Sequence, residues 1–314
     1  LIAGNDTMGT GSASQQGTGL YALGGKAFIA GCVISNHTQL GSNGYGAGLY
    51  LASQSPDVVV SNCIFIHNST SHSGGGAYFH GGTIVDSLFT NNYARNNAGG
   101  AYPYGMATGS RMIRCRVIHN YAGLSGGGVN INRGILSHCV IMGNTAMTTG
   151  GGVYNNEGTL TNCLIAANFA AQRGGGMFRD NKVYSVVNCT IIRNHAGIEG
   201  GGVYNLAPAI VFTNNIVFWN YATNGVRNDI TSNTASFVYS CGLELLGGAS
   251  GNLAEDPLFL DGGSGYGTNA TLGDYRLQTN SPCVNTGTNQ PWMGWPRGVD
   301  LAGENRIRPF WGRV

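Results

Sequence analysis

A run of three glycines followed by a small apolar residue recurs along the chain at nearly constant spacing. The runs begin at positions 74, 126, 150, 174 and 200, with a looser copy that begins at Ala98. Taken in order from position 74, the copies are 24, 28, 24, 24 and 26 residues apart. A second phrase, a cysteine followed five residues later by an asparagine, repeats in phase with the glycines. Two motifs held at one period predict a stack of similar structural repeats.

The cysteine phrase is complete in five repeats and altered in two. The complete copies are Cys63–Asn68, Cys115–Asn120, Cys139–Asn144, Cys163–Asn168 and Cys189–Asn194. We align Asp86 with the cysteine in the repeat that ends at Asn91, and Asn215 with the cysteine in the repeat that ends at Asn220.

A period near 24 residues suits either a leucine-rich repeat or a right-handed parallel β-helix. A leucine-rich repeat would place a helix or regular leucines in the half that holds the glycine triplets. Three consecutive glycines and a short Val-Tyr or Ala-Tyr strand do not suit a helix, and glycine supplies 53 of the 314 residues. We therefore predict an all-β fold, a single-stranded right-handed parallel β-helix with a loop-rich C-terminal cap.

Each predicted coil has a strand around Cys-x-Ile, a turn at the asparagine, a second strand around Gly-Val-Tyr and a variable loop. The pattern predicts degenerate coils in residues 1–45, regular coils in 46–224, and C-terminal coils with a cap in 225–314. The phrases Gly17–Tyr21 and Cys32–Asn36 are the weak early copies.

Three kinds of repeated side chain are expected to stack on equivalent side chains of neighbouring coils, and we interpret all three as architecture. The cysteines form an inward ladder. The asparagine ladder consists of Asn68, Asn91, Asn120, Asn144, Asn168, Asn194 and Asn220. The aromatic ladder consists of Tyr50, Tyr78, Tyr102, Tyr154, Phe178 and Tyr204, and is broken at Asn130.

The ladder cysteines are expected to be free thiols, because in-register neighbours have parallel Cβ vectors too far apart for a bridge. Cys241 and Cys283 lie outside the repeat and are the plausible single disulfide in an exported protein. With no Cys-x-x-Cys pair, metal binding by cysteine is not expected. We expect no cofactor; calcium is compatible with the sequence, but no site for it is recognisable.

A net charge of +2 excludes a polybasic nucleic-acid binder, and the absence of an apolar run of about eighteen residues excludes a transmembrane helix.

The phrases Gly-Gly-Gly-Val-Tyr and Val/Ile/Phe-x-x-Asn resemble the repeats of chlamydial-type polymorphic outer membrane proteins. They also resemble secreted bacterial proteins with pectate-lyase-like parallel β-helix repeats. Residues 252–308, with Asp256–Phe259, Asp274–Leu277 and Ser281–Cys283, are similar to the C-terminal end of the latter group. The resemblance implies a right-handed β-helix that is secreted or exposed at a bacterial cell surface. It transfers no reaction, because such repeats occur in adhesins and in polysaccharide lyases, and the aspartate cluster of the pectate-lyase calcium site has no counterpart.

Charged side chains are scarce, at 10% of the chain, so their concentration at one position of the repeat is notable. Six residues before the cysteine position lie His80, Arg133 and Glu157, with Tyr104 in an intervening insertion and Arg179, Asp180 and Lys182 on the next loop. In such a groove an arginine or lysine would neutralise a uronate carboxylate while another group removes the α-proton in β-elimination. Glu157 and Asp180 could instead be the two carboxylates of a glycosidase. A third interpretation makes Arg133 and Glu157 a salt bridge between adjacent coils.

A second candidate strip follows the first strand. Its basic residues are Arg114, Arg116, His119 and His138, which are predicted to converge on two neighbouring coils. Forked arginine hydrogen bonds there could bind an anionic glycan, or the residues could be a solvated face.

Two hypotheses of function remain open. The first is a secreted carbohydrate-active β-helix that holds an anionic polysaccharide along its coils and cleaves it by β-elimination; glycoside hydrolysis is the second choice of reaction. The second is a non-catalytic surface adhesin, passenger or filament protein, whose low charge permits self-association.

Overall fold

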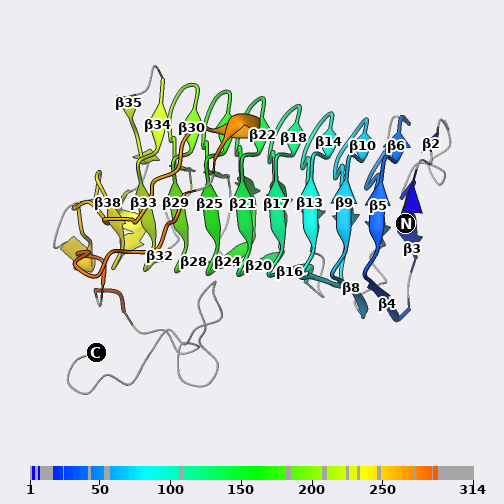
Figure 1. Cartoon of the computed structure of the whole chain (residues 1–314), viewed down its shortest axis with the longest axis horizontal. Coiled ribbons are helices and arrows are strands. Elements are labelled where there is room, and N and C mark those ends of the chain that lie inside the picture. The colour runs from blue at the N-terminus through cyan, green and yellow to red at the C-terminus, as the bar shows by residue number, and fades with distance from the viewer. Residues whose placement is uncertain are drawn as a thin grey trace.

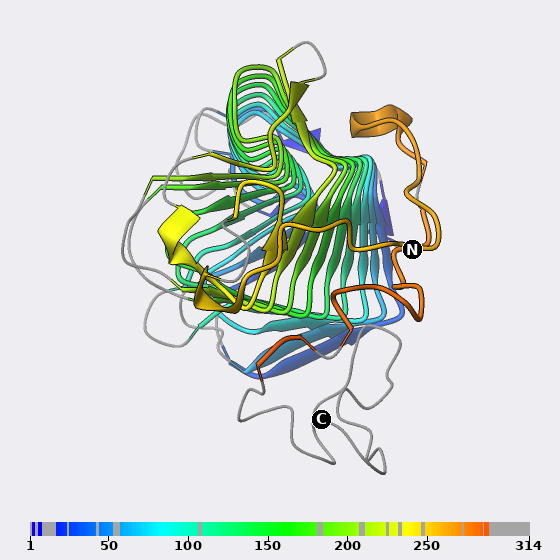
Figure 2. The same cartoon turned by 90° about the vertical axis from the view of Figure 1, so that its left-hand side faces the viewer.

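The computed structural model describes residues 2–3, 6–7, 17–23, 25–41, 44–52, 57–105, 109–180, 185–206, 211–223, 226–231, 234–245, 249–271, 273–284 and 286–288. These residues wind into a right-handed parallel β-helix, as the period of the repeat predicted (Figures 1 and 2). Each coil contributes one strand to each of four sheets, which we number 1 to 4 in the order in which a coil enters them. Neighbouring strands pair in parallel and in register, apart from one pair at the end of sheet 2.

Sheets 1 and 2 each contain ten strands. Sheet 1 consists of β1 (Ile2–Ala3), β5 (Val33–Ser35), β9 (Ile64–Ile66), β13 (Leu88–Thr90), β17 (Arg116–Ile118), β21 (Val140–Met142), β25 (Leu164–Ala166), β29 (Thr190–Ile192), β33 (Ile216–Phe218) and β38 (Cys241–Gly242). Sheet 2 consists of β2 (Asp6–Thr7), β6 (Thr38–Gln39), β10 (Ser69–Thr70), β14 (Tyr93–Ala94), β18 (Tyr121–Ala122), β22 (Thr145–Ala146), β26 (Phe169–Ala170), β30 (His195–Ala196), β34 (Tyr221–Ala222) and β35 (Val226–Arg227), the last two being antiparallel.

Sheets 3 and 4 each contain nine strands. Sheet 3 consists of β3 (Leu20–Ala22), β7 (Leu49–Leu51), β11 (Ala77–Phe79), β15 (Ala101–Pro103), β19 (Val129–Ile131), β23 (Val153–Asn155), β27 (Met177–Arg179), β31 (Val203–Asn205) and β36 (Ile230–Thr231). Sheet 4 consists of β4 (Ala27–Ala30), β8 (Val58–Ser61), β12 (Thr83–Val85), β16 (Arg111–Ile113), β20 (Ile135–Ser137), β24 (Thr159–Thr161), β28 (Val186–Val187), β32 (Phe212–Thr213) and β37 (Phe237–Val238). The described helices are the 3-10 turns η1 (Thr234–Ser236), η2 (Ala249–Gly251) and η3 (Gly267–Asn269).

Sheets 1 and 3 are the two strands that the sequence predicted for each coil. Sheet 4 lies in the segment that the sequence analysis treated as a variable loop. Most of its strands bury one or two apolar residues in the core, at Ile84, Met112, Leu136 and Leu160 among others. The variable loop was therefore the wrong interpretation, because one buried residue in three is enough to fix a short strand on its neighbours.

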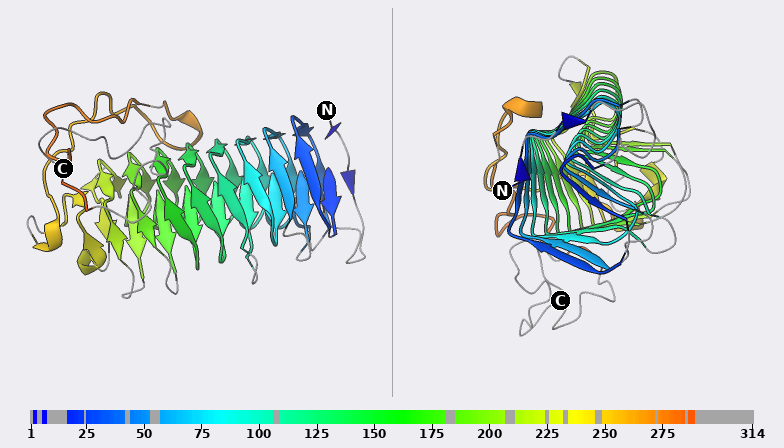
Figure 3. Two further views of the ribbon diagram at one scale, coloured as in Figure 1. Left: turned by 90° about the horizontal axis from the view of Figure 1, so that it is seen from below. Right: turned by 90° about the vertical axis from the view of Figure 1, so that its right-hand side faces the viewer.

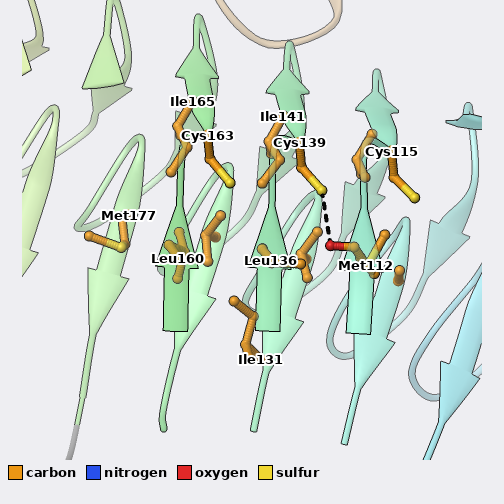
Figure 4. Packing of buried hydrophobic residues seen from close by; sticks show 14 of the residues in the cluster. Met112, Cys115, Ile131, Leu136, Cys139, Ile141, Leu160, Cys163, Ile165 and Met177 are labelled. Carbon is orange, nitrogen blue, oxygen red and sulfur yellow. Dashed lines mark hydrogen bonds between the residues drawn. The ribbon is translucent and has the colours of Figure 1, made fainter. Parts of the chain in front are cut away.

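The core is a column of apolar side chains that runs the length of the stack. Sheet 1 contributes the middle residue of each strand, such as Ile141, and the cysteine that precedes the strand, such as Cys139 (Figure 4). The thiol of Cys139 donates to the carbonyl oxygen of Met112 at 3.5 Å and of Ser137 at 3.4 Å. The predicted inward ladder of free cysteines is confirmed.

The asparagine ladder is buried and continuous. Asn144 donates from Nδ2 to Oδ1 of Asn168 at 3.0 Å, and its own Oδ1 accepts the backbone and side-chain N–H groups of Asn120 at 2.9 and 3.0 Å. Each rung also donates to a core-strand carbonyl, as Asn144 does to Val117 at 2.9 Å. The ladder therefore satisfies buried donors and acceptors that would be costly to leave unpaired.

The predicted alignment was wrong by one residue in a single coil. The pairing of Ile64 with Leu88 places Ser87, not Asp86, in the cysteine position, and Asn92, not Asn91, in the ladder. Asn91 is instead an exposed left-handed residue with φ of 52°. Asn91 and Asn92 are adjacent, and each has a residue five positions before it that could fill the cysteine position. The spacing of the motif alone therefore could not show which asparagine belongs to the ladder.

The ladder ends on a carboxylate. Oδ1 of Asp229 accepts both the backbone N–H of Asn220, at 2.7 Å, and its Nδ2, at 2.9 Å. Burial raises the pKa of Asp229 to about 6, and Glu244 contributes to the rise. The direction of the hydrogen bonds is thus the same along the whole ladder, from Asn68 to Asp229.

The glycine triplets line the return from sheet 2 to sheet 3, where backbones approach closely. A Cβ on the second glycine of a run, Gly75, would lie 2.4 Å from the carbonyl oxygen of Tyr93. A Cβ on the third, Gly128, would lie 2.7 Å from the oxygen of Gly152 and 2.8 Å from Nδ2 of Asn144. The triplet therefore exists because no side chain fits between the asparagine ladder and the next coil.

Two rows of left-handed residues turn the chain into and out of sheet 1. The row at its start includes Asn62, Arg114, His138 and Asn162, and the row at its end includes His67, His119 and Arg193. Asparagine tolerates this conformation better than most residues, which explains its frequency at the first row. Asn62, His67 and Arg114 of these rows are exposed, His119, His138 and Arg193 are half-buried, and Asn162 is buried.

After β38 the chain turns back along the outside of sheet 1, shown in orange in Figures 1 and 3. We call residues 256–271 and 273–284 the strap. The strap is a hairpin in which Phe259 pairs with Leu277, and Phe259 is buried against Met142, Leu164 and Ile192 of sheet 1. Its tip is tied down by the backbone N–H of Gly267, which donates to the oxygen of Ala167 at 2.7 Å. The strap thus covers the apolar outer face of β21 to β33.

Cys241 and Cys283 are free thiols in the structure, which differs from the predicted disulfide. Within the described part of the chain, no helix has the length and hydropathy that a membrane span requires.

Candidate functional site

The outer face of sheet 3 carries the aromatic ladder. The middle residue of each strand points outward while its two neighbours face the core, and register aligns Tyr50 with Tyr78 and Tyr102, and Tyr154 with Phe178 and Tyr204. Asn130 lies opposite Tyr154 and interrupts the rings, as predicted. Tyr50 and Tyr78 stack with centroids 5.7 Å apart, and Phe178 and Tyr204 at 5.3 Å. Tyr78 and Tyr102 meet edge to face instead, and Tyr50, Tyr78, Phe178 and Tyr204 are each less than 10% exposed, whereas Tyr102 and Tyr154 are half-buried.

A second row borders the ladder on the side where the strands of sheet 3 end. Backbone hydrogen bonds align His80, Tyr104, Asn132, Asn156 and Asp180 on successive coils. His80 and Tyr104, both predicted from the sequence, are brought together with ring centroids 5.0 Å apart. They pack on Tyr78, and burial lowers the pKa of His80.

Arg133 and Glu157 do not share that row, because the alignment on the cysteine position was one residue out in the coil that contains His80. They follow Asn132 and Asn156, just beyond the strands, and Nε of Arg133 forms an ion pair with Oε2 of Glu157. The interpretation as a salt bridge between adjacent coils is therefore confirmed. Asp180 accepts a hydrogen bond of 2.5 Å from the hydroxyl of Tyr154, whose pKa is raised by burial and by this bond.

Arg179 is not on the surface, and its predicted catalytic role is wrong. It occupies the same side of β27 as Met177, is 1% exposed, and points into the core. Its Nη1 donates to Oδ1 of Asn205 at 2.7 Å, its guanidinium lies 5.8 Å from the ring of Phe212, and burial lowers its pKa to about 10. A group enclosed in the stack cannot reach a polymer outside it. Lys182 lies outside the described residues.

A third row, which the sequence analysis missed, borders the ladder on its other side. Its members are the residues that directly precede each glycine run: Tyr45, Ser73, Asn97, Ser125, Thr149, Arg173 and Glu199. The first glycine of each run has positive φ and turns the chain sharply toward the ladder. A Cβ on Gly200, for example, would lie 2.8 Å from the Cβ of Tyr204. The position before the glycine run was a usable signal for this row.

The charges of the third row are also paired. Nε of Arg173 donates to Oε1 of Glu199 at 2.7 Å, and its guanidinium lies 5.3 Å from the ring of Tyr204. On the two coils that carry Arg133 and Glu157, the three rows carry hydroxyls and amides: Ser125, Thr149, Asn130, Asn132 and Asn156. We call the three rows together the sheet 3 strip. Its described side chains offer many neutral donors and acceptors, with their charged groups joined in pairs or, for Asp180, bonded to a phenol.

The predicted basic patch is divided across sheet 1. Arg114 and His138 lie in the left-handed row at the start of the sheet, Arg116 is exposed on β17, and His119 lies at the far end of that strand. Arg114 forms a two-pronged ion pair with Asp86, at 2.7 and 2.8 Å, which lowers the pKa of the carboxyl and raises that of Arg114. His138 is held by Ser137 at 2.8 Å and Asn162 at 3.1 Å. The patch therefore holds less uncompensated charge than the sequence suggested.

Among the described residues, no group of three or more His, Cys, Asp and Glu side chains is arranged to hold a metal ion.

Comparison with known proteins supports the architecture and goes no further. A family model described as a right handed beta helix region matches residues 31–177. No curated protein and no solved structure matches the chain. With the coordinates, this match identifies a right-handed β-helix repeat protein.

Proposed function

We propose that this β-helix repeat protein binds a polysaccharide without cleaving it, holding an extended glycan along the sheet 3 strip. The observation that supports the proposal is the register of the strip. Its polar side chains recur from coil to coil in register with their equivalents on the next coil. An extended glycan is a linear polymer whose hydroxyls recur in the same manner, and a regular row of donors and acceptors can bond several sugars at once.

The pairing of charges supports an uncharged glycan rather than the polyanion expected from the sequence. Arg133 is joined to Glu157 and Arg173 to Glu199, so a uronate would have to compete with a carboxylate already in place. Binding would therefore depend on hydrogen bonds and on contact with the partly exposed rings of Tyr102, Tyr104 and Tyr154, because tyrosine is well suited to such amphipathic contacts.

The same pairing speaks against β-elimination. That reaction needs a cation on the substrate carboxylate and a base near its α-proton. Arg179 is enclosed in the core, and glutamates hold both Arg173 in the strip and Arg133 next to it. We infer a rigid, non-catalytic module that is secreted or displayed on a bacterial surface, with a glycan as its ligand. Incubation with pectate, alginate or hyaluronan is expected to release no unsaturated uronate, and a rise in its ultraviolet absorbance would contradict this part of the proposal.

Affinity electrophoresis tests the binding. The protein is run through gels that contain neutral polymers, such as xylan, mannan, galactan and mixed-linkage glucan, or anionic ones. We expect retardation by a neutral polymer, and a loss of about tenfold in affinity for Tyr104→Ala and for Asn132→Ala, corresponding to about 1.4 kcal/mol each.

Tyr93→Ala is the matched control, since Tyr93 is an exposed tyrosine that stacks on Tyr121 of sheet 2, outside the strip. Circular dichroism checks that each variant is folded. Retardation by no polymer, or an equal loss for Tyr93→Ala, would refute the binding site; retardation by anionic polymers alone would refute the neutral ligand.

A further inference from the structure

The end of the strap is anchored beside the last coil. Oγ of Ser281 donates to the carbonyl oxygen of Pro257 at 2.6 Å and accepts the backbone N–H of Cys283 at 3.1 Å. A few residues on, Thr288 donates its N–H to Oδ1 of Asn214 at 2.8 Å and accepts from Nδ2 of Asn214 at 2.6 Å. These bonds hold Cys283 in a fixed place relative to sheet 1.

Cys241, at the start of β38, faces Cys283 across this junction. Its thiol is buried and donates to the carbonyl oxygen of Glu255 at 3.2 Å, two residues before Pro257, which accepts the hydroxyl of Ser281 next to Cys283. The two cysteines therefore lie beside the same short segment, residues 255–257, and interaction between their thiols shifts both pKa values. The two cysteines come from different segments rather than from adjacent rungs of one ladder. Their Cβ vectors are therefore not constrained to be parallel, which is the condition that prevents bridges within a ladder.

The two thiols are unequal in the way that disulfide exchange requires. Cys283 is partly exposed, and interaction with the thiol of Cys241 lowers its pKa, so it is the thiol that an external oxidant can reach as a thiolate. Cys241 is buried, and the same interaction together with burial raises its pKa. The ladder thiols of Cys115, Cys139 and Cys163 are all buried with raised pKa, which protects them from oxidation.

We propose that Cys241 and Cys283 are a modification site, at which oxidation forms a disulfide that staples the strap to the last strand of sheet 1. The thiolate of Cys283 attacks the disulfide of an oxidant such as glutathione disulfide and forms a mixed disulfide, releasing one glutathione thiolate. The thiolate of Cys241 then attacks the sulfur of Cys283 and releases the second glutathione. The two cysteines lose two protons and two electrons, and one glutathione disulfide is reduced to two thiols.

The staple would close a ring that contains the whole strap, including Phe259 and the tip at η3. Closing the ring restricts the unfolded chain and keeps the strap on sheet 1 when the junction loosens. The ladder cysteines lie outside the ring, so the staple would not disturb the coils.

Thiol titration tests the modification. The intact protein is incubated with glutathione disulfide, unfolded without reductant, and titrated. Of the eight cysteines, we expect two to be lost, leaving six titratable thiols, with all eight recovered after reduction. Peptide mapping should join the peptides of Cys241 and Cys283. Eight thiols after oxidation, or a map that joins a different pair such as Cys32 and Cys63, would overturn the proposal.

Two variants separate the staple from general oxidation. Cys283→Ser should show all its seven remaining thiols after oxidation, and Cys32→Ser, a matched control at a partly exposed cysteine, should still lose two of its seven. The oxidised wild-type protein should melt several degrees higher than the reduced one, and Cys283→Ser should remove this difference. A mapped bridge with no change in Tm would refute the stapling role, and these outcomes do not depend on glycan binding.

Discussion

At the scale of single residues, the buried ionisable groups make stability depend on pH. The ring of His195 packs on Phe169, with centroids 5.6 Å apart, and on Tyr266 of the strap, at 4.4 Å, and Tyr266 also packs on Phe169. Burial lowers its pKa, so the unfolded chain binds a proton more readily than the folded one. The contribution of His195 is therefore complete above its unfolded pKa of about 6.5 and is lost as the pH falls below it.

We expect His195→Phe to keep the ring contacts and reduce this dependence. Urea unfolding at pH 7.5 and at pH 5.5 should show a smaller difference in the free energy of unfolding for the variant than for the wild type. An unchanged difference would mean that His195 is not shielded from water as the contacts with Phe169 and Tyr266 indicate.

Arg179 shows why one predicted catalytic residue was expected on the surface although it is buried in the core. Charged residues are rarely buried, so the sequence favoured the surface. The alternation of side chains along β27 indicated that Arg179 faces the core, because it is two residues from the core side chain of Met177. Two rules conflicted, and the alternation prevailed because Asn205 supplies an acceptor inside the stack.

Replacing Arg179 tests this account. Arg179→Met should lower the free energy of unfolding by about 1–3 kcal/mol, because Oδ1 of Asn205 loses its donor in the core. The double variant Arg179→Met/Asn205→Leu should recover most of the loss, since it removes both polar groups together. Urea denaturation of the single and double variants measures both values; a double variant as unstable as the single one would contradict the pairing.

At the scale of elements, the asparagine ladder shows what the repeat could and could not predict. The period placed almost every rung, because each asparagine lies a fixed distance after a cysteine. It failed at Asn91 and Asn92, where two asparagines are adjacent and only the register of β13 on β9 distinguishes them. Sheet 4 was missed for a related reason: one apolar residue in a short segment is a weak pattern until its equivalents on other coils are aligned.

The corrected rung leads to a paired prediction. Asn92→Ala removes bonds to Asn120 and to the carbonyl of Phe65, and should cost about 3 kcal/mol. Asn91→Gly, next to it, should cost almost nothing, since glycine accepts the left-handed conformation. Thermal and urea unfolding compare the two variants; similar losses for both would show that Asn92 is not the rung of the ladder in this coil.

At the scale of the whole molecule, register turns separate residues into a continuous surface. The sequence predicted that His80, Tyr104 and Asp180 share one face, and the structure aligns them in one row, because all three follow the aromatic strand. The row from Tyr45 to Glu199 was missed, since those residues have no common side chain and share only their position before the glycines. The sequence offered the ion pair of Arg133 with Glu157 as one of three interpretations, but it did not predict that Glu199, one coil away, neutralises Arg173.

The length of the strip sets an expectation for the glycan. From Tyr50 to Tyr204 the ladder spans six steps between coils, about 29 Å at about 4.8 Å a step. Affinity for oligosaccharides of the preferred polymer should rise with each added sugar and level off once the oligosaccharide reaches about that length. Calorimetry with a graded series measures this; affinity that levels off at one or two sugars would indicate a local pocket instead of a strip.

The carboxylate of Asp229 gives the stack a sense of direction. The side-chain amide of each earlier rung both donates and accepts hydrogen bonds, so each rung needs an acceptor on the next rung. The carboxylate of Asp229 accepts the hydrogen bond from Asn220 and donates none, so it needs no acceptor on a further rung. Replacing Asp229 with asparagine would add an amide donor at the end of the ladder, where no further rung provides an acceptor. A single oxygen in place of a nitrogen thus ends the asparagine ladder and makes its two ends chemically different.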